Sequence, residues 1–163
     1  MGDIITYYLE MKSPAGLVAK PPVTDLQVNE VRIDSFPLNK FLYEYVGKPW
    51  GWVDKLVWTD EQWRQWVEQP GLRTWVAYHL GAPAGYFELH KPSSEQVEIA
   101  YFGLARNFIG LGFGGYLLSS AIQNAWEWGN VRRVWVHTCT LDHPGALKNY
   151  QARGFEIYKT ETE

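Results

Sequence analysis

Residues 106–118 read RNFIGLGFGGYLL, and this stretch decides the fold. Its glycines, Gly110, Gly112, Gly114 and Gly115, follow a strand-like run and precede apolar residues that recur at helical spacing. Glycines at such a turn let the backbone curl with its amide groups pointing inward, and these amides add to the positive end of the helix dipole. The stretch therefore predicts a cradle for a phosphate group.

The spacing of Gly110, Gly112 and Gly115 also satisfies the G-x-G-x-x-G fingerprint of dinucleotide-binding folds. Only 48 residues follow Gly115, too few for the remaining strands of a doubly wound sheet. The acidic residue expected roughly 20 residues later is missing. Tyr116 and Leu117 come directly after Gly115, in place of the Lys and Ser/Thr of the phosphate-binding loop of nucleoside triphosphatases, so that loop is absent as well. The sequence therefore disfavours both nucleotide sites, and close packing of the helix against a strand is the alternative to a phosphate cradle.

The patterns on either side of the cluster predict a mixed α/β order. Upstream, three strand-like runs are joined by short turns and predict an antiparallel meander, over residues 72–80, 85–89 and 97–104. Downstream, the long helix ends near Gly129 and is followed by a strand, a short helix and a last strand, over residues 131–138, 144–152 and 155–158. We therefore expect an α/β fold with an antiparallel meander followed by a strand-helix-strand crossover.

The segment before residue 72 is expected to contribute strands and two helices. Residues 4–11 are β-branched and aromatic, and residues 25–33 alternate imperfectly, which is typical of strands. Ser35 precedes the first helical pattern. Thr59 with Gln62 three residues later predicts a capping box at the start of the second helix.

Composition describes a single folded domain over residues 1–163. With 46% hydrophobic and 20% charged residues the chain is too apolar to be disordered and long enough to bury a core. The net charge of -3, without a dense Lys/Arg stripe, excludes nucleic acid as an expected partner. Cys139 is the single cysteine, which excludes an intramolecular disulfide and fits a reducing cytosol. No signal peptide or apolar run of about 18 residues is seen, so we expect a cytoplasmic protein without a membrane partner.

Two motifs together resemble the GNAT superfamily of acyl-CoA-dependent N-acyltransferases. Gly112-Phe113-Gly114 fits the Gly-x-Gly part of its Gln/Arg-x-x-Gly-x-Gly/Ala signature, and Leu104 stands where a Val usually closes the strand. Residues 146–155, ALKNYQARGF, match its Ala-x-x-x-Tyr-x-x-x-Gly-Phe pattern. The resemblance covers about residues 72–158 and looks like one bacterial branch. It implies a GNAT-like fold with splayed central strands, and acetyl transfer from acetyl-CoA to a primary amine by direct attack, without a metal.

The sequence departs from the family pattern at three places. Ile109 occupies the Gln/Arg position, so only backbone amides remain there to bind the pyrophosphate. His143 stands where an Asn commonly precedes the last helix. Only eight residues follow Phe155, too few for the usual final hairpin, so either the leading segment or a second subunit, as in a homodimer, is expected to complete the sheet.

The resemblance also implies the catalytic residues. Glu98 lies eleven residues before position 109, where the family has a recurrent catalytic Glu, and burial would raise its pKa toward the range useful for a general base. The alternative is a strand carboxylate paired with Arg73 or Arg132. Tyr150 matches the Tyr that protonates the leaving thiolate, and the alternative is a core tyrosine. An acyl intermediate on Cys139 is a weaker alternative, because no Cys-His arrangement supports it.

By the same resemblance, one set of residues is expected to bind acetyl-CoA: Phe102, Leu104, Ile109, Gly110, Leu111, Gly112, Phe113, Gly114, Gly115, His143 and Ala146. For His143 the alternative role is to begin the last helix. His79 and His90 lack a carboxylate partner at metal-binding spacing, so no metal is expected.

Aromatic residues make up 16% of the chain, and five of the nine Trp lie between positions 50 and 66. In the superfamily this region forms the acceptor wall. We therefore expect Trp50, Trp52 and Trp58 to bind a small-molecule or peptide amine, unless these rings belong to the core. The nearby carboxylates Asp54, Asp60 and Glu61 would attract a cationic amine. The competing functions are a non-catalytic acyl-CoA-binding or sensor domain and an aromatic-cage module for quaternary ammonium or sugar ligands.

Overall fold

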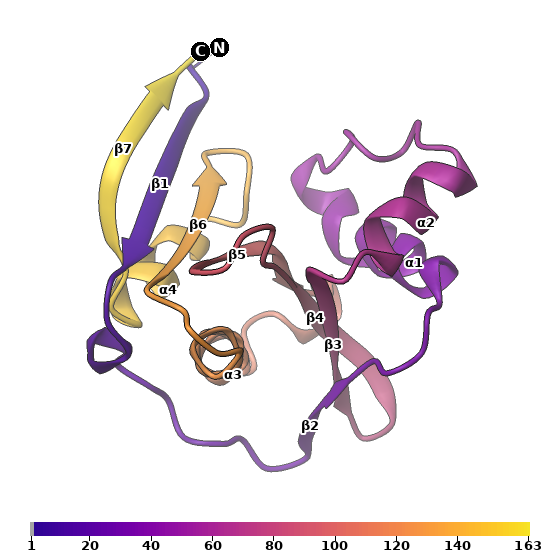
Figure 1. Ribbon diagram of the computed structural model, residues 1–163, viewed down its shortest axis with the longest axis horizontal. Helices are drawn as coiled ribbons and strands as arrows, with labels where there is room; N and C mark the ends of the chain where they lie inside the picture. Colours follow the sequence, from indigo (N-terminus) through magenta and orange to yellow (C-terminus); the bar gives the residue numbers. More distant parts are fainter. Residues whose placement is uncertain (1) are drawn as a thin grey trace.

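A computed structural model describes residues 2–163 and confirms the mixed α/β fold (Figure 1). Seven strands form one sheet in the order β2-β3-β4-β5-β6-β1-β7. The strands are β1 Ile5–Met11, β2 Leu26–Glu30, β3 Leu72–His79, β4 Ala82–His90, β5 Gln96–Leu104, β6 Arg133–Cys139 and β7 Glu156–Thr162. The helices are α1 Phe36–Gly47, α2 Asp60–Glu68, α3 Gly114–Trp126 and α4 Ala146–Ala152, with short 3-10 turns η1 Pro14–Gly16, η2 Lys48–Trp50 and η3 Arg106–Phe108.

The antiparallel meander is formed by β3, β4 and β5, as predicted, but its first turn is tighter than expected. Leu80 and Gly81 both have positive φ, 49° and 90°, as in the two-residue turns that match the twist of a hairpin. Because the turn uses only these two residues, β4 begins at Ala82 and not at Gly85. Pro83 is accommodated beside an irregularity in the pairing at Ala77 and Tyr78.

The leading segment completes the sheet. β1 lies between β6 and β7 and is antiparallel to both, with Thr6 opposite Cys139 and Ile5 opposite Thr162 (Figure 1). The last strand, expected to begin within residues 155–158, starts at Glu156, and this pairing carries β7 on to Thr162.

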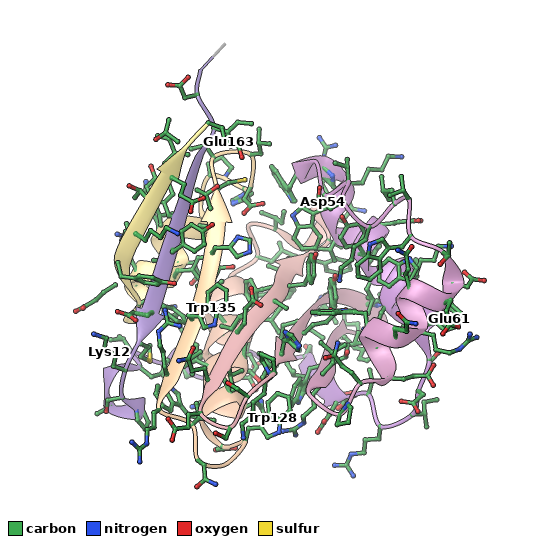
Figure 2. All side chains as sticks on the ribbon, turned by 45° about the horizontal axis from the view of Figure 1, so that its top comes forward. Lys12, Asp54, Glu61, Trp128, Trp135 and Glu163 are labelled. Atoms are coloured by element: carbon green, nitrogen blue, oxygen red, sulfur yellow. The ribbon has the colours of Figure 1, made fainter. Side chains whose placement is uncertain are left out.

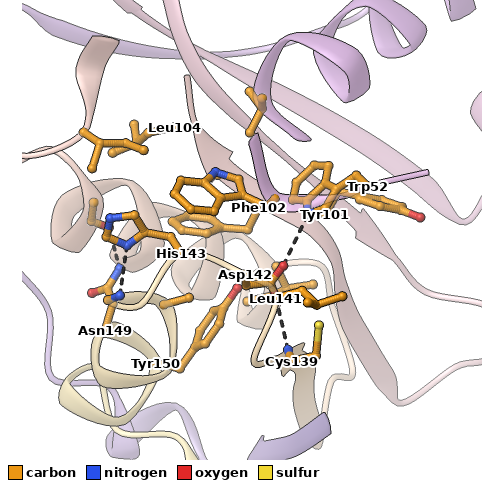
Figure 3. Close-up of a pocket in the computed structure, with 18 of the residues that line it drawn as sticks. Trp52, Tyr101, Phe102, Leu104, Cys139, Leu141, Asp142, His143, Asn149 and Tyr150 are labelled. Carbon is orange, nitrogen blue, oxygen red and sulfur yellow. Dashed lines mark hydrogen bonds between the residues drawn. The ribbon is translucent and has the colours of Figure 1, made fainter. Parts of the chain in front are cut away.

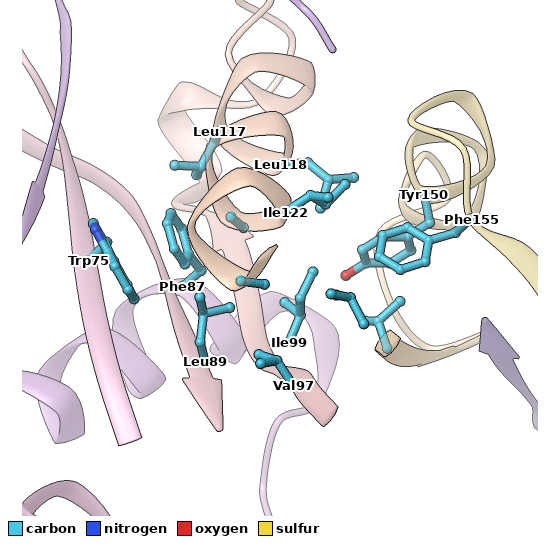
Figure 4. Packing of buried hydrophobic residues seen from close by; sticks show 14 of the residues in the cluster. Trp75, Phe87, Leu89, Val97, Ile99, Leu117, Leu118, Ile122, Tyr150 and Phe155 are labelled. Atoms are coloured by element: carbon cyan, nitrogen blue, oxygen red, sulfur yellow. The ribbon is translucent and has the colours of Figure 1, made fainter. Parts of the chain in front are cut away.

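Helices cover both faces of the sheet. On one face, Leu117, Leu118 and Ile122 of α3 pack against the strands, in a cluster that also contains Phe87 and Ile99 (Figure 4). On the other face, α1 packs Leu42 and Val46 against β3 and β4. Full burial of each large apolar side chain contributes roughly 1.5–3 kcal/mol, so these two layers stabilise the meander.

The second helix begins as its sequence indicates. The Thr59 hydroxyl accepts a hydrogen bond from the Gln62 amide, and the Gln62 side chain accepts one from the Thr59 amide at 2.9 Å, which completes the capping box. Ser35 precedes α1 as expected, although its side chain makes no capping hydrogen bond. None of the helices within residues 2–163 is long and apolar enough to cross a membrane.

The central strands splay apart, as the family resemblance implies. β5 and β6 are parallel neighbours, but they pair only from Gln96–Glu98 to Arg133–Trp135. Beyond this point β5 follows β4 and β6 follows β1, and the two strands diverge (Figure 1). The divergence leaves an opening in the middle of the sheet.

Candidate active site

A cavity of about 570 Å³ lies where β5 and β6 diverge (Figure 3). Its wall is built from Tyr43 and Val46 of α1 and from four further stretches of chain, within residues 50–54, 99–104, 109–115 and 137–150. Asp54 and Asp142 line it, whereas no Lys or Arg in the part of the chain that the structure describes does. The cavity is therefore apolar with an acidic side.

One edge of β5 faces this opening. From Ile99 to Leu104 the strand pairs with β4 on one side only, because its pairing with β6 ends at Glu98. Backbone N-H and C=O groups on such a free edge can bind an extended ligand as a further strand would be bound. Phe102 and Leu104, both expected to bind the cofactor, line the cavity here.

The glycine-rich turn closes one end of the cavity. Gly110 and Gly112 both have φ of 85°, a left-handed conformation that favours glycine. The N-H groups of residues 110–113 donate to no acceptor within residues 2–163, and the first amides of α3 follow directly. Phe113, which is 5% exposed, anchors the turn in the core. The turn thus presents free donors at a helix start, an arrangement suited to an anion.

Nearly all of the residues expected at the cofactor site line the cavity, and Leu111 is the exception because its side chain is exposed. Ile109, Ala146 and His143 are among those that line it. His143 also starts the last helix: its Nδ1 atom accepts a hydrogen bond from the Gly145 amide at 2.9 Å.

Tyr150 projects from α4 into the cavity and is 5% exposed (Figure 3). Its ring packs against Phe102 and Phe155, with centroid distances of 6.1 and 6.0 Å. Its hydroxyl makes no hydrogen bond to any group in residues 2–163. Burial and the nearby Asp142 carboxylate raise the pKa of Tyr150, so the phenol stays protonated and can donate a proton.

Asp142 joins two walls of the cavity. One carboxylate oxygen accepts hydrogen bonds from the Thr138 hydroxyl and the Cys139 amide, and the other accepts from Trp52 Nε1 at 3.3 Å (Figure 3). Trp52 belongs to the segment after α1, 90 residues away in the sequence. The sequence analysis did not single out Asp142, and its position beside His143 was the available signal.

A second contact joins the same two walls. The Trp50 and His143 rings meet edge to face at a centroid distance of 5.1 Å. Asn149, which also lines the cavity, donates from Nδ2 to the carbonyl of Gly114 at 3.1 Å, which fixes α4 against the start of α3. The sequence analysis did not single out Asn149 either.

Glu98 lies at the fork between β5 and β6, beside the cavity and not among the residues that line it. Its carboxylate is 3.8 Å from His137 Nε2, and the His137 ring does line the cavity. Arg73 and Arg132, the alternative partners, pair with other carboxylates. Burial raises the pKa of Glu98, and the charges of His137 and Lys55 partly oppose this rise.

The three tryptophans expected at the acceptor wall separate in the structure. Trp50 and Trp52 line the cavity, whereas Trp58 does not. Asp54 also lines the cavity, and in Figure 2 it lies in the same half of the molecule as Glu61, which is at the outer edge on α2. Asp60 and Glu61 instead form ion pairs on the helix surface, so Asp54 is the acidic residue of this region that faces the cavity.

Trp58 takes part in an aromatic cage that holds Lys55. The Lys55 ammonium lies 4.5, 5.4, 4.0 and 4.1 Å from the ring centroids of Trp58, Trp63, Trp66 and Tyr101. It is 5% exposed and has no hydrogen-bond partner within residues 2–163. Burial lowers the pKa of Lys55 to about 8, although carboxylates nearby oppose the change. The cage is thus filled by the chain's own lysine, which leaves no room for the external ligand of an aromatic-cage module.

In the loop after η2, which contains this lysine, the usual burial pattern is reversed: the charged side chain is inside and apolar side chains are outside. Lys55 is buried, whereas the apolar side chains of Val53, Leu56 and Val57 are exposed, Val57 by 84%. Cation-π contacts are worth about 0.5–2 kcal/mol each, so the cage anchors the loop that carries Trp52 and Asp54 to the cavity. The clustering of Trp around Lys55 in the sequence was a signal that the analysis did not use.

Metal and thiol chemistry find little support in the geometry. Across residues 2–163, no three His, Cys, Asp or Glu side chains lie close enough together to hold a metal ion. Cys139 lines the cavity as a free thiol, and no histidine in this part of the chain hydrogen-bonds to it.

Comparisons with known proteins agree with this architecture. The model of the acetyltransferase (GNAT) family matches residues 38–155. A GCN5-related N-acetyltransferase from Kribbella flavida superposes on 97% of the chain with a TM-score of 0.69 and 18% sequence identity, and one from Sphaerobacter thermophilus on 99% with a TM-score of 0.69 and 14% identity. The chain spans 58% and 51% of the lengths of these two proteins.

A third solved structure, of which the match covers a larger share, is similar as well. An aminoglycoside acetyltransferase from an uncultured soil metagenomic sample, in complex with trehalose, superposes on 79% of the chain with a TM-score of 0.63 and 17% identity, and the match covers 87% of that protein. No curated protein sequence matches the chain. At these identities the solved structures establish the fold.

Proposed function

The chain belongs to the GNAT acetyltransferase family, and from this premise we propose that it transfers an acetyl group from acetyl-CoA to a primary amine. The observation that carries the proposal is the cavity at the fork of β5 and β6, which joins the glycine-rich turn at one end to Tyr150. A donor with phosphates, an extended arm and a thioester needs three features along one cavity: here the glycine-rich turn, the free edge of β5 and Tyr150.

The residues present fit such a donor. The free amides of residues 110–113 and the start of α3 suit its phosphate oxygens. The free edge of β5 suits the amide groups of its pantetheine arm. Its thioester would then lie near Tyr150, where backbone N-H groups around Phe102–Leu104 would polarise the carbonyl.

The proposed reaction needs a neutral amine and a protonated leaving group. Glu98, whose pKa burial raises, takes a proton from the amine directly or through a water molecule. The amine nitrogen then forms a bond to the carbonyl carbon, and the carbon-sulfur bond breaks. Tyr150 gives its proton to the departing thiolate, and the second proton, which the nitrogen loses as it becomes an amide, restores the phenol. No covalent enzyme intermediate is needed, so Cys139 takes no part.

The acceptor is proposed to be a small-molecule or peptide amine that enters as a cation. Asp54 and Asp142 make the cavity acidic, and no Lys or Arg side chain within residues 2–163 lines it to oppose them. Trp50 and Trp52 supply flat walls for an apolar body attached to the amine.

The test is a thiol-release screen with acetyl-CoA over amines, amino acids and peptides. The proposal predicts release of free CoA that depends on the amine, together with one acetylated amine per CoA. Because Glu98 lies beside the cavity and not on its wall, a non-catalytic acyl-CoA-binding domain is the second candidate. Tight CoA binding with no amine-dependent release would favour that candidate and contradict the proposal.

A further inference from the structure

Arg153 is a buried cation without a partner. It follows α4 and is 7% exposed. Its Nε atom is buried and makes no hydrogen bond, and its guanidinium forms no ion pair with a carboxylate in residues 2–163. A buried charge without a partner is strongly destabilising, so proteins normally pair such groups or use them to bind an ion.

The guanidinium lies over the first turn of α3. A Cβ atom added at Gly115 would overlap Arg153 Nη1 and would lie 2.8 Å from Lys20 Cγ. Position 115 has no room for a Cβ atom, because the side chains of Arg153 and Lys20 pack against it. Gly115 also lines the cavity. Arg153 and Lys20 thus lie against Gly115 at the glycine-rich turn, next to the residues that line the cavity and not among them.

The main chain at both cationic residues is held in place by the fold. The Arg153 carbonyl accepts a hydrogen bond from the Val18 amide at 2.9 Å, and the Lys20 amide donates to Ser119 Oγ of α3 at 2.8 Å. The leading segment is therefore tied both to the end of α4 and to α3. The site does not depend on a mobile surface lysine alone.

The neighbouring backbone is also prepared for an anion. α3 has 13 residues, and its first N-H groups point toward this end of the cavity together with the free amides of residues 110–113. Position 109, at the same turn, carries Ile and offers no charge. Partial positive charge from the backbone and the full positive charge of Arg153 therefore lie together beside Gly115.

We propose that Arg153, with Lys20 beside it, binds a phosphoryl group of the acyl donor and supplies the positive charge that Ile109 does not. This inference rests on the proposed function, since it assumes a donor with phosphates. The guanidinium would hydrogen-bond phosphate oxygens in a forked geometry, while Lys20 adds a point charge. The phosphate oxygens belong either to the diphosphate or to the 3′-phosphate of CoA.

The test measures the dissociation constants of CoA and 3′-dephospho-CoA by calorimetry. Arg153→Gln is expected to weaken CoA binding by roughly tenfold to a hundredfold, the range for a lost hydrogen bond to a charged group. Equal loss for both ligands would identify the diphosphate as the partner, whereas loss confined to CoA would identify the 3′-phosphate. Arg132→Gln is the matched control, because its side chain is 80% exposed and it makes the same change of charge.

Two further variants keep the test decisive. Gly115→Ala retains both charges but displaces the guanidinium, and it should weaken CoA binding as well. Lys20→Gln should weaken it several-fold and reduce its dependence on salt concentration. These variants carry the test if Arg153→Gln does not fold.

Thermal unfolding without ligand separates a binding role from a structural one. Removal of an unpaired buried charge should leave the melting temperature of Arg153→Gln equal to that of the wild type or higher. A lowered melting temperature with an unchanged dissociation constant would overturn the inference and leave the proposed function standing. Failure of the wild-type protein to bind CoA at all would overturn both.

Discussion

Replacing Lys55 with Met is expected to change how stability depends on pH. The pKa of Lys55 is lowered from 10.5 to about 8 in the folded protein, because its ammonium is buried in the aromatic cage. Below pH 8 Lys55 is charged in both the folded and the unfolded states. Between about 8 and 10.5 it is neutral in the folded protein and charged in the unfolded chain, so unfolding takes up a proton and stability rises with pH.

The size of this rise follows from the shift. At roughly 1.4 kcal/mol per pH unit, the free energy of unfolding of the wild type should gain about 3 kcal/mol over that of Lys55→Met across the interval. The assay is urea unfolding, followed by circular dichroism, at pH 7, 8, 9 and 10. Lys48→Met, which removes an exposed lysine from the neighbouring turn, is the control and should run parallel to the wild type. Parallel curves for Lys55→Met and the wild type would refute the reasoning.

Three further predictions concern the reaction. Tyr150→Phe should slow turnover by roughly 10²- to 10⁴-fold, with the dissociation constant of CoA and the melting temperature unchanged; unaltered turnover would contradict its role as the acid. The wild-type kcat/KM should fall on the acidic side at a pH above 4.5, because burial raises the pKa of Glu98, and Glu98→Gln should lose this fall. A wild-type profile that stays flat from pH 9 down to pH 4.5, or an unchanged profile in the variant, would remove Glu98 as the base. Trp52→Phe deletes the hydrogen bond to Asp142 but keeps an aromatic ring, so KM for the amine should rise roughly three- to tenfold while the dissociation constant of CoA stays unchanged. Weaker CoA binding with an unchanged KM for the amine would show that Trp52 contacts the donor and not the acceptor.

Local sequence patterns predicted the elements around the glycine-rich turn well. The meander, the helix after Gly115 and the capping box at Thr59 depend on spacing within a few residues, and the structure contains all three. The start of β4 was misplaced because Gly81-Ala82-Pro83 is typical of a turn, whereas the chain turns at Leu80 and Gly81.

The position of β1 could not be predicted from its own sequence. Alternation along a strand determines which face each side chain occupies, but it does not identify the neighbouring strands. The pairs that place β1 between β6 and β7 join residues more than 120 positions apart, such as Thr6 and Cys139.

The same distinction applies to the candidate site. The glycine-rich turn and Tyr150 were found because each belongs to a short motif. Lys55 and Arg153 were not, because their importance lies in burial by side chains from other elements. Charged residues are predicted to be exposed from sequence alone, because most of them are. Only the packing shows that these two are buried.

Direct acetyl transfer within the cavity is the central claim, and a two-step labelling experiment tests it most directly. The protein is first mixed with acetyl-CoA that carries a labelled acetyl group, and an amine identified by the thiol-release screen is then added. The predicted result is no label on the protein in the first step, followed by one labelled acetyl group on the amine for each CoA released. Label on Cys139 before the amine is added, or release of CoA without a labelled amine, would contradict the account.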